Sequence, residues 1–167
     1  MAISIVIYED NDNLRESLSS LLSMTEDYEV LGAYPNCVKV EEQVKVLQPH
    51  VILMDIDMPE VNGITAVKKI RQFDKKVQVI MLTVFDDNTH VYDALCAGAN
   101  GYLLKKFVSD KLISSIQEVL SGGAPMSPTI ARMVIGNMHQ PASPNDYQLT
   151  NREKEILQLL SITPSGV

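Results

Sequence analysis

The sequence is poor in cysteine, has no excess of basic residues and contains no long apolar run. Its two cysteines, Cys37 and Cys96, form no disulfide-framework pattern, which suits a reducing compartment. No apolar run approaches the ~20 residues that a membrane-spanning helix requires. The N-terminus lacks a basic leader region and turns acidic at Glu9, which argues against a signal peptide. We therefore expect a soluble, cytoplasmic protein without a membrane partner.

The charge of the chain is acidic, with 21 Asp and Glu against 14 Lys and Arg and a net charge of -7 at pH 7. Residues 1–121 carry the whole excess, because residues 122–167 hold equal numbers of the two signs. An acidic surface is repelled by nucleic-acid phosphates. We therefore expect that this chain, as it stands, does not bind DNA specifically.

What the chain does contain is a regular alternation of strand-length apolar runs with segments of helical period. Its 167 residues are 46% hydrophobic, enough for one sizeable core. The runs with strand character cover residues 3–8, 28–33, 51–54, 77–82 and 101–104. Such alternation is typical of βα units around a buried parallel sheet. We predict an α/β fold with a doubly wound, five-stranded parallel sheet of flavodoxin type over residues 1–121.

Residues with strong positional preferences mark the ends of the predicted helices. Pro49 prevents the second helix from continuing, and the acids Asp86 and Asp87 suit the start of the fourth. Ser109 is the predicted N-cap of the fifth helix, which ends at Gly122–Gly123.

The composition changes from Gly122 onwards. Ser127 and Pro128 predict the start of a short helix with an apolar stripe at Ile130, Met133, Val134 and Met138. Residues 140–146 have linker composition, so we expect a linker with a short helix over 122–148.

A second amphipathic helix is predicted over 151–160, because Thr150-Asn151-Arg152-Glu153 fits a capping box. One helix cannot form a domain. Residues 149–167 are therefore either the fragment of a truncated second domain, the interpretation we favour, or a docked tail.

Polar side chains follow four of the predicted strands. Glu9 and Asp10 follow the first strand, Asp55 the third, Thr83 the fourth and Lys105 the fifth. Because the carboxyl ends of parallel strands meet at one edge of a sheet, we expect these side chains to converge. Any one of them alone would be an ordinary solvated loop residue, but the set argues for shared chemistry.

That chemistry is aspartyl phosphorylation with a divalent metal. Neighbouring carboxylates repel one another, and oxygen ligands suit Mg²⁺, which would relieve the repulsion. We expect Asp10 to be a direct ligand, Glu9 to act through water, and the Asp57 backbone carbonyl to contribute with Asp55. Asp55 would be the nucleophile towards a phosphoryl donor.

The remaining two side chains would neutralise the phosphoryl group. Lys105 would pair with Asp55 at rest and with a phosphoryl oxygen afterwards. The Thr83 hydroxyl would donate a hydrogen bond to another phosphoryl oxygen. Pro59 and Gly63 are expected to shape the loop after Asp55.

The order of these motifs points to a known family. Glu9-Asp10, Asp55 within Leu-Met-Asp-Ile-Asp-Met-Pro-Glu-Val-Asn-Gly, Thr83, and Gly-Tyr-Leu-Leu-Lys ending at Lys105 resemble the motifs of a response-regulator receiver domain. The segments Gly-Ala-Asn-Gly-Tyr-Leu-Leu-Lys, Gly-Gly-Ala-Pro-Met-Ser-Pro and Leu-Thr-Asn-Arg-Glu-Lys-Glu-Ile-Leu resemble the NarL/FixJ subfamily. Members of that subfamily end in a LuxR-type helix-turn-helix domain.

The resemblance implies a two-component response regulator. A sensor histidine kinase would donate the phosphoryl group to Asp55, and Tyr102 would be the switch aromatic that reorients as Thr83 turns towards the phosphate. From composition alone, Tyr102 would be an ordinary core residue. A phosphorylation-dependent homodimer is a possible output state.

The resemblance also bears on DNA binding and on catalysis. Transcription regulation through DNA would use a turn and recognition helix that are not found after Leu160. The receiver would assist its own phosphorylation and dephosphorylation, and turnover of an external substrate is not expected.

Two other functions compete with this interpretation. Asp55-Ile56-Asp57 imitates the Asp-x-Asp motif of haloacid-dehalogenase-type phosphatases, but there the acidic pair comes last, whereas here Glu9-Asp10 leads. A phosphatase of that kind also needs a cap insertion, and none of that size is present. A phosphorylation-independent interaction domain is disfavoured by the complete set of acceptor, metal and lysine positions.

Overall fold

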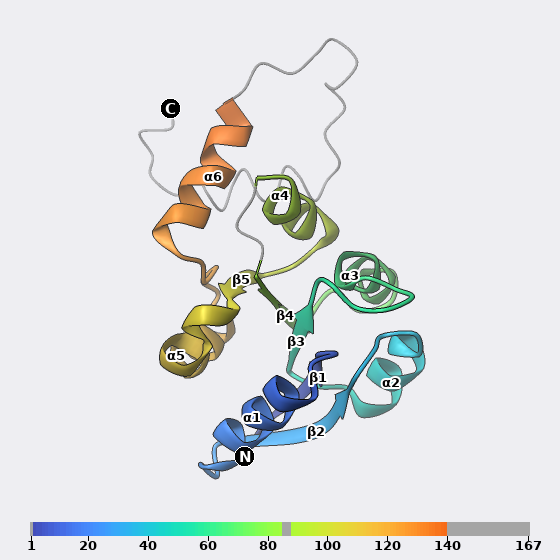
Figure 1. Cartoon of the computed structure of the whole chain (residues 1–167). Helices are drawn as coiled ribbons and strands as arrows, with labels where there is room; N and C mark the ends of the chain where they lie inside the picture. The colour runs from blue at the N-terminus through green and yellow to red at the C-terminus, as the bar shows by residue number, and fades with distance from the viewer. Residues whose placement is uncertain (1, 85–87, 140–167) are drawn as a thin grey trace.

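The computed structural model describes residues 2–84 and 88–139, in which strands and helices alternate along the chain (Figure 1). The elements are β1 Ile3–Tyr8, α1 Asp12–Ser23, β2 Tyr28–Tyr34, α2 Val40–Leu47, β3 Val51–Asp55, α3 Gly63–Arg71, β4 Gln78–Thr83, α4 Asn88–Ala97, β5 Gly101–Leu104, the 3₁₀ turn η1 Lys105–Phe107, α5 Val108–Leu120 and α6 Pro128–His139.

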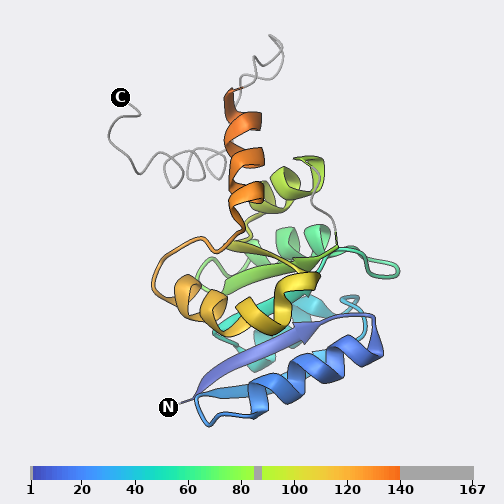
Figure 2. The ribbon, with the colours of Figure 1, turned by 60° about the vertical axis from the view of Figure 1, so that its left-hand side comes forward.

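The strands form one five-stranded sheet in the order β2-β1-β3-β4-β5, and every pairing is parallel. Helices α1 and α5 cover one face, while α2, α3 and α4 cover the other (Figures 1 and 2). The order reverses direction at β1, which makes the sheet doubly wound and confirms the predicted fold class. No helix in the described ranges is long and apolar enough to span a membrane.

The central strands form because their side chains are apolar on both faces. All five residues of β3, Val51–Asp55, are buried, as expected for a parallel strand covered by helices on both sides. Helices α1 and α3 each begin at an asparagine cap. Asn11 Oδ1 accepts the Leu14 N–H at 2.9 Å, and Asn62 Oδ1 accepts the Thr65 N–H at 2.9 Å. These two side-chain caps therefore fix where the helices after β1 and β3 begin.

Two boundaries differ from the sequence prediction in a way that matters for the site. β3 extends to Asp55 and β4 extends to Thr83, so both side chains belong to the last residue of a strand. The predicted N-cap at Ser109 is wrong, because η1 runs directly into α5 and places Ser109 inside the helix. The predicted helix start at Asp86 and Asp87 lies outside the described residues.

The helix predicted after Ser127 is present as α6. The Ile130 N–H donates to Ser127 Oγ at 3.2 Å, and Pro128 is the first helical residue, as predicted. α6 lies beside α4 (Figures 1 and 2), and its Ile130 and Val134 are fully buried in the same core cluster as α4. The predicted linker 140–146 and helix 151–160 lie outside the described residues.

The segment that leads into α6 covers the outer edge of β5. The Tyr102 N–H donates to the Pro125 carbonyl at 2.8 Å. A Cβ atom on Gly101 would lie 2.6 Å from Pro125 Cγ, so glycine is what allows this close approach. Residues 124–127 therefore lie against the sheet edge before the chain turns into α6.

Candidate functional site

The predicted site residues converge at the carboxyl end of the sheet. Glu9 follows β1 and is fully buried, Asp55 and Thr83 end β3 and β4 and are 1% exposed, and Asp10 is exposed. Lys105 follows β5 and crosses to the central strands. Its Nζ lies 2.8 Å from Glu9 Oε1 and 3.2 Å from Asp55 Oδ2. One ammonium therefore bridges two buried carboxylates from neighbouring strands.

The electrostatics of the site are dominated by this burial. Burial raises the pKa of Asp55 to about 8, with hydrogen bonding to Glu9 and the Glu9 charge acting in the same direction and Lys105 opposing them. Partial burial also raises the pKa of Asp10, but hydrogen bonds with Glu9 and Asp55 and the Lys105 charge lower it below its usual value overall. Burial lowers the pKa of Lys105, yet its contacts with Glu9 and Asp55 raise it overall, so it is a cation.

The donor set fits a hard divalent cation. One carboxylate oxygen from each of Glu9, Asp10 and Asp55 can be chosen so that the three lie within 4.8 Å of one another. Glu9 Oε1 and Asp55 Oδ2 are buried, and the Lys105 ammonium is the cation that faces them. Ionising all three carboxyl groups against the one ammonium would leave an excess of negative charge, which a divalent cation would offset. All the ligands are oxygens, the class that Mg²⁺ prefers.

The loop after β3 holds the Asp55 carboxylate from the other side. The Asp57 N–H donates to Asp55 Oδ1 at 3.3 Å, while the Asp57 side chain is exposed. The Gly63 N–H donates to the Ile56 carbonyl at 2.8 Å. A Cβ on Gly63 would lie 2.0 Å from the Asp55 carbonyl oxygen, so only glycine lets α3 begin this close to the site.

Thr83 ends β4 at the site, and Tyr102 lies on the adjacent strand β5. A small cavity of about 150 Å³ opens beside Thr83 and is lined by Thr83, Val84, Leu104, Lys105 and Lys106. Tyr102 is fully buried on the face of the sheet that α4 and α6 cover. Thr83 therefore borders open space at the site, whereas the Tyr102 ring is enclosed by the core.

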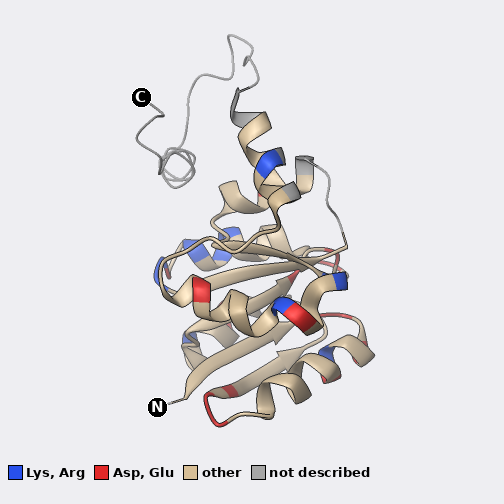
Figure 3. Cartoon of the chain, turned by 90° about the vertical axis from the view of Figure 1, so that its left-hand side faces the viewer, with Lys and Arg blue, Asp and Glu red and all other residues tan. Residues whose placement is uncertain are grey.

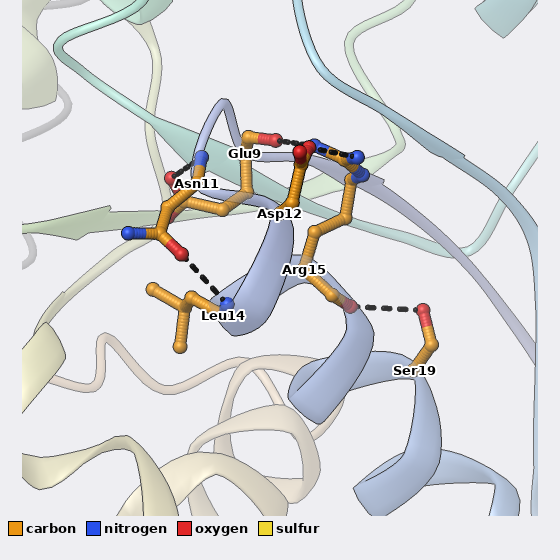
Figure 4. Close-up of polar contacts among 6 residues, drawn as sticks. All are labelled: Glu9, Asn11, Asp12, Leu14, Arg15 and Ser19. Carbon is orange, nitrogen blue, oxygen red and sulfur yellow. Dashed lines mark hydrogen bonds and ion pairs between the residues drawn. The ribbon is translucent and has the colours of Figure 1, made fainter.

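Sequence reasoning did not identify two residues of α1 and its cap that hold Glu9 (Figure 4). The Asn11 N–H donates to Glu9 Oε2 at 3.1 Å, and Arg15 Nη1 donates to the Glu9 carbonyl at 2.8 Å. Arg15 Nη2 also pairs with Asp12 at 2.5 Å. The available signal was a cation close to the start of a helix, where the helix dipole disfavours it.

The geometry agrees with comparisons to known proteins. A family model described as the response regulator receiver domain matches residues 5–117. The transcriptional regulatory protein LnrK of Bacillus subtilis is 35% identical over 165 residues, which cover 93% of this chain and 75% of LnrK. The transcriptional regulatory protein DegU of Brevibacillus brevis is 34% identical over 176 residues, covering 95% and 75%.

A solved structure is similar in shape as well. The crystal structure of a LuxR-family two-component response regulator from Aurantimonas sp. SI85-9A1 has a TM-score of 0.76 at 25% identity. The match covers 84% of this chain and 100% of that one.

Proposed function

The chain belongs to the response regulator receiver domain family, and from this premise we propose that Asp55 is where this two-component response regulator accepts its phosphoryl group. One observation carries the proposal. The Lys105 ammonium lies 2.8 Å from Glu9 and 3.2 Å from Asp55, and the Asp10 carboxylate belongs to the same cluster. An acceptor, a cation for the transferred group and additional acids for a metal therefore meet at the carboxyl edge of the sheet.

The chemistry proceeds by in-line displacement from a phosphohistidine of a sensor histidine kinase. An Asp55 carboxylate oxygen forms the new bond to phosphorus while the P–N bond breaks and the imidazole leaves. Lys105 transfers its ionic contact from Asp55 to a phosphoryl oxygen. The Thr83 hydroxyl, next to the cavity beside Lys105, donates to another phosphoryl oxygen.

Mg²⁺ would be held by Asp10 and Asp55 directly, by Glu9 through water, and by the Asp57 backbone carbonyl. Both Glu9 oxygens already have cationic or N–H partners, Lys105 and Asn11, which supports its indirect role. Asp10 is exposed and can turn towards an ion. When bound, the metal supplies positive charge to the phosphoryl oxygens and so lowers the cost of bringing an anion to the acids.

The proposed output runs through Thr83 and Tyr102. Movement of the Thr83 hydroxyl towards phosphate vacates space that the Tyr102 ring can fill, which alters the outer surface near α4 and β5. This change would favour a homodimer. In full length, residues 1–121 would be the receiver, 122–148 the linker and 149–167 part of a helix-turn-helix domain that binds DNA.

The phosphatase alternative receives no support from the geometry of Asp57. The second acid of an Asp-x-Asp motif must reach the leaving group, but the Asp57 side chain is exposed, and its N–H is what contacts Asp55. The site therefore favours a phosphoacceptor that assists its own modification over an enzyme with an external substrate.

The test is phosphorylation of the purified chain with acetyl phosphate and MgCl₂, followed by intact mass spectrometry. Wild type should gain one phosphoryl group, and Asp55→Asn should gain none. Asp57→Asn is the matched control, because its exposed side chain is not used, and it should label like wild type. EDTA should prevent labelling of wild type. Unchanged labelling of Asp55→Asn would refute the assignment.

A further inference from the structure

Arg15 occupies an unfavourable place for a cation. It is the fourth residue of α1, near the positive end of the helix dipole, where acidic residues are stabilising and basic ones are not. Its side chain is nevertheless only 20% exposed and lies along the loop that joins β1 to α1. Because Arg15 does not stabilise its own helix, its presence is better explained by the contacts of its side chain.

The side chain contacts the backbone of the acidic pair (Figure 4). Arg15 Nη1 donates to the Glu9 carbonyl oxygen at 2.8 Å, and Asp12 holds the other terminal nitrogen at 2.5 Å. The Glu9 carbonyl belongs to the peptide plane whose nitrogen is that of Asp10. The hydrogen bond from Arg15 to this oxygen therefore fixes the orientation of the Glu9–Asp10 peptide, and with it the direction in which the Asp10 side chain projects.

Glu9 is already fixed at its other polar atoms. Its N–H donates to the Tyr34 carbonyl at 3.0 Å, Oε2 accepts the Asn11 N–H at 3.1 Å, and Oε1 contacts Lys105. The carbonyl is the remaining polar atom, and Arg15 is its donor. Asp10, by contrast, is exposed and depends on the peptide before it for its placement.

We propose that Arg15 is a positioning residue for the divalent-metal site, acting through the Glu9–Asp10 peptide and without contacting the metal. The inference rests on the proposed function, in which Asp10 is a direct ligand. Partners that orient metal ligands from behind commonly contribute tenfold or more to metal affinity. The Arg15–Asp12 ion pair is not the basis of the effect, because Asp12 is 83% exposed and such pairs contribute little.

The experiment is a titration of the full 167-residue chain with MnCl₂, followed by the EPR signal of free Mn²⁺, with MgCl₂ as competitor. Mn²⁺ shares the oxygen-ligand preference of Mg²⁺ and gives a readout that does not depend on phosphorylation. Arg15→Met keeps the length of the stem and removes the donors, and it should bind both ions about tenfold more weakly. Arg15→Lys restores one donor and should recover most of the affinity.

Asp12→Ala is the matched control. It removes the ion pair but leaves the bond from Arg15 to Glu9, so affinity should change by less than about threefold. Thermal unfolding of each variant separates a loss of helix stability from a loss of metal affinity.

The outcomes distinguish this inference from the proposed function. Wild-type affinity in Arg15→Met, or an equal loss in Arg15→Lys and Arg15→Met, would overturn the positioning role alone. Absence of Mn²⁺ and Mg²⁺ binding by wild type would overturn both the metal site and the role of Arg15.

Discussion

At the scale of single residues, burial and the neighbouring Glu9 oppose ionisation of Asp55, whereas Lys105 favours it. The Asp55 carboxyl is 1% exposed, faces Glu9 and is paired with Lys105, and burial raises its pKa to about 8. The raised pKa favours the protonated form of Asp55, even though the Lys105 ammonium opposes the shift. In the proposed reaction, added positive charge from a divalent metal would favour the Asp55 carboxylate, which would link metal binding to activation of the nucleophile.

The raised pKa of Asp55 also predicts how the stability of the folded protein depends on pH. An unfolded Asp55 ionises near its ordinary pKa, whereas the folded residue keeps its proton up to about pH 8. The folded state therefore binds more protons between these two values, so Asp55 costs stability progressively as pH rises through that window. Asp55→Asn cannot ionise, so its stability advantage over wild type should grow as pH rises through this window and be largest near pH 8.

Urea unfolding of both proteins in EDTA, at several values between pH 4 and pH 8, measures this difference. The two proteins should approach equal stability at the acidic end. A difference that stays constant with pH would show that the substitution acts through packing and not through the charge.

Residue order in the sequence predicted which side chains would meet, because parallel strands bring their carboxyl ends to one edge. Asp55, Thr83 and Lys105 are found there for that reason. The sequence could not predict that Glu9 would be buried and Asp10 exposed. That choice depends on the path of the chain after β1 and on a side-chain contact from Arg15, which neither periodicity nor spacing records.

At the scale of elements, α6 is joined to the core of the receiver. Ile130 and Val134 are fully buried in the cluster that contains α4 and Tyr102, while the neighbouring Ile135 is 40% exposed. The segment before α6 is also anchored, through the bond from the Tyr102 N–H to Pro125. We therefore expect residues 124–139 to stabilise the receiver, although composition alone assigns them to a linker.

Val134→Ala tests this expectation. It removes two buried methyl groups from the α4–α6 contact and should lower the free energy of unfolding by about 1–3 kcal/mol. Ile135→Ala, one residue further along the same helix, changes a half-exposed side chain and should cost less than about 0.5 kcal/mol. Urea denaturation of both variants gives the comparison, and equal small losses would mean that α6 is not part of the cooperative unit.

The ends of elements were harder to predict than their existence. Ser127 and Pro128 identified the start of α6 correctly, because capping chemistry is local. Ser109 misidentified the start of α5, because η1 supplies the first turn and the chain enters the helix without a side-chain cap. The apolar stripe of α6 predicted a buried face, but a stripe does not specify its partner, and the packing on α4 emerges only in three dimensions.

At the scale of the whole molecule, the chain is acidic overall. Figure 3 shows that basic and acidic residues both occur along the ribbon of the described residues. Phosphorylation would add further negative charge at the carboxyl edge of the sheet. Because like charges repel, self-association after phosphorylation would need a local rearrangement of the structure. The proposed route begins at Thr83, beside the cavity next to Lys105, and passes to the buried ring of Tyr102.

Thr83→Ala separates phosphorylation from its output. The variant retains Asp55 and Lys105 and should still be labelled by acetyl phosphate, but its phosphorylation-dependent self-association should be weakened severalfold. Mass spectrometry measures the labelling, and sedimentation velocity measures the association. Thr65→Ala, an exposed threonine on α3, is the control and should behave as wild type. Wild-type association by phosphorylated Thr83→Ala would place the route elsewhere.

The proline that lies against β5 has a consequence for colloidal behaviour. An edge strand with unpaired amides is a template on which another chain can add a strand and begin an aggregate. Here the Tyr102 N–H is taken by Pro125, and a proline has no N–H of its own to offer to a further strand. Growth of the sheet beyond β5 is thereby blocked at this point. A strand from another molecule would have to displace this segment before it could pair with β5 at Tyr102.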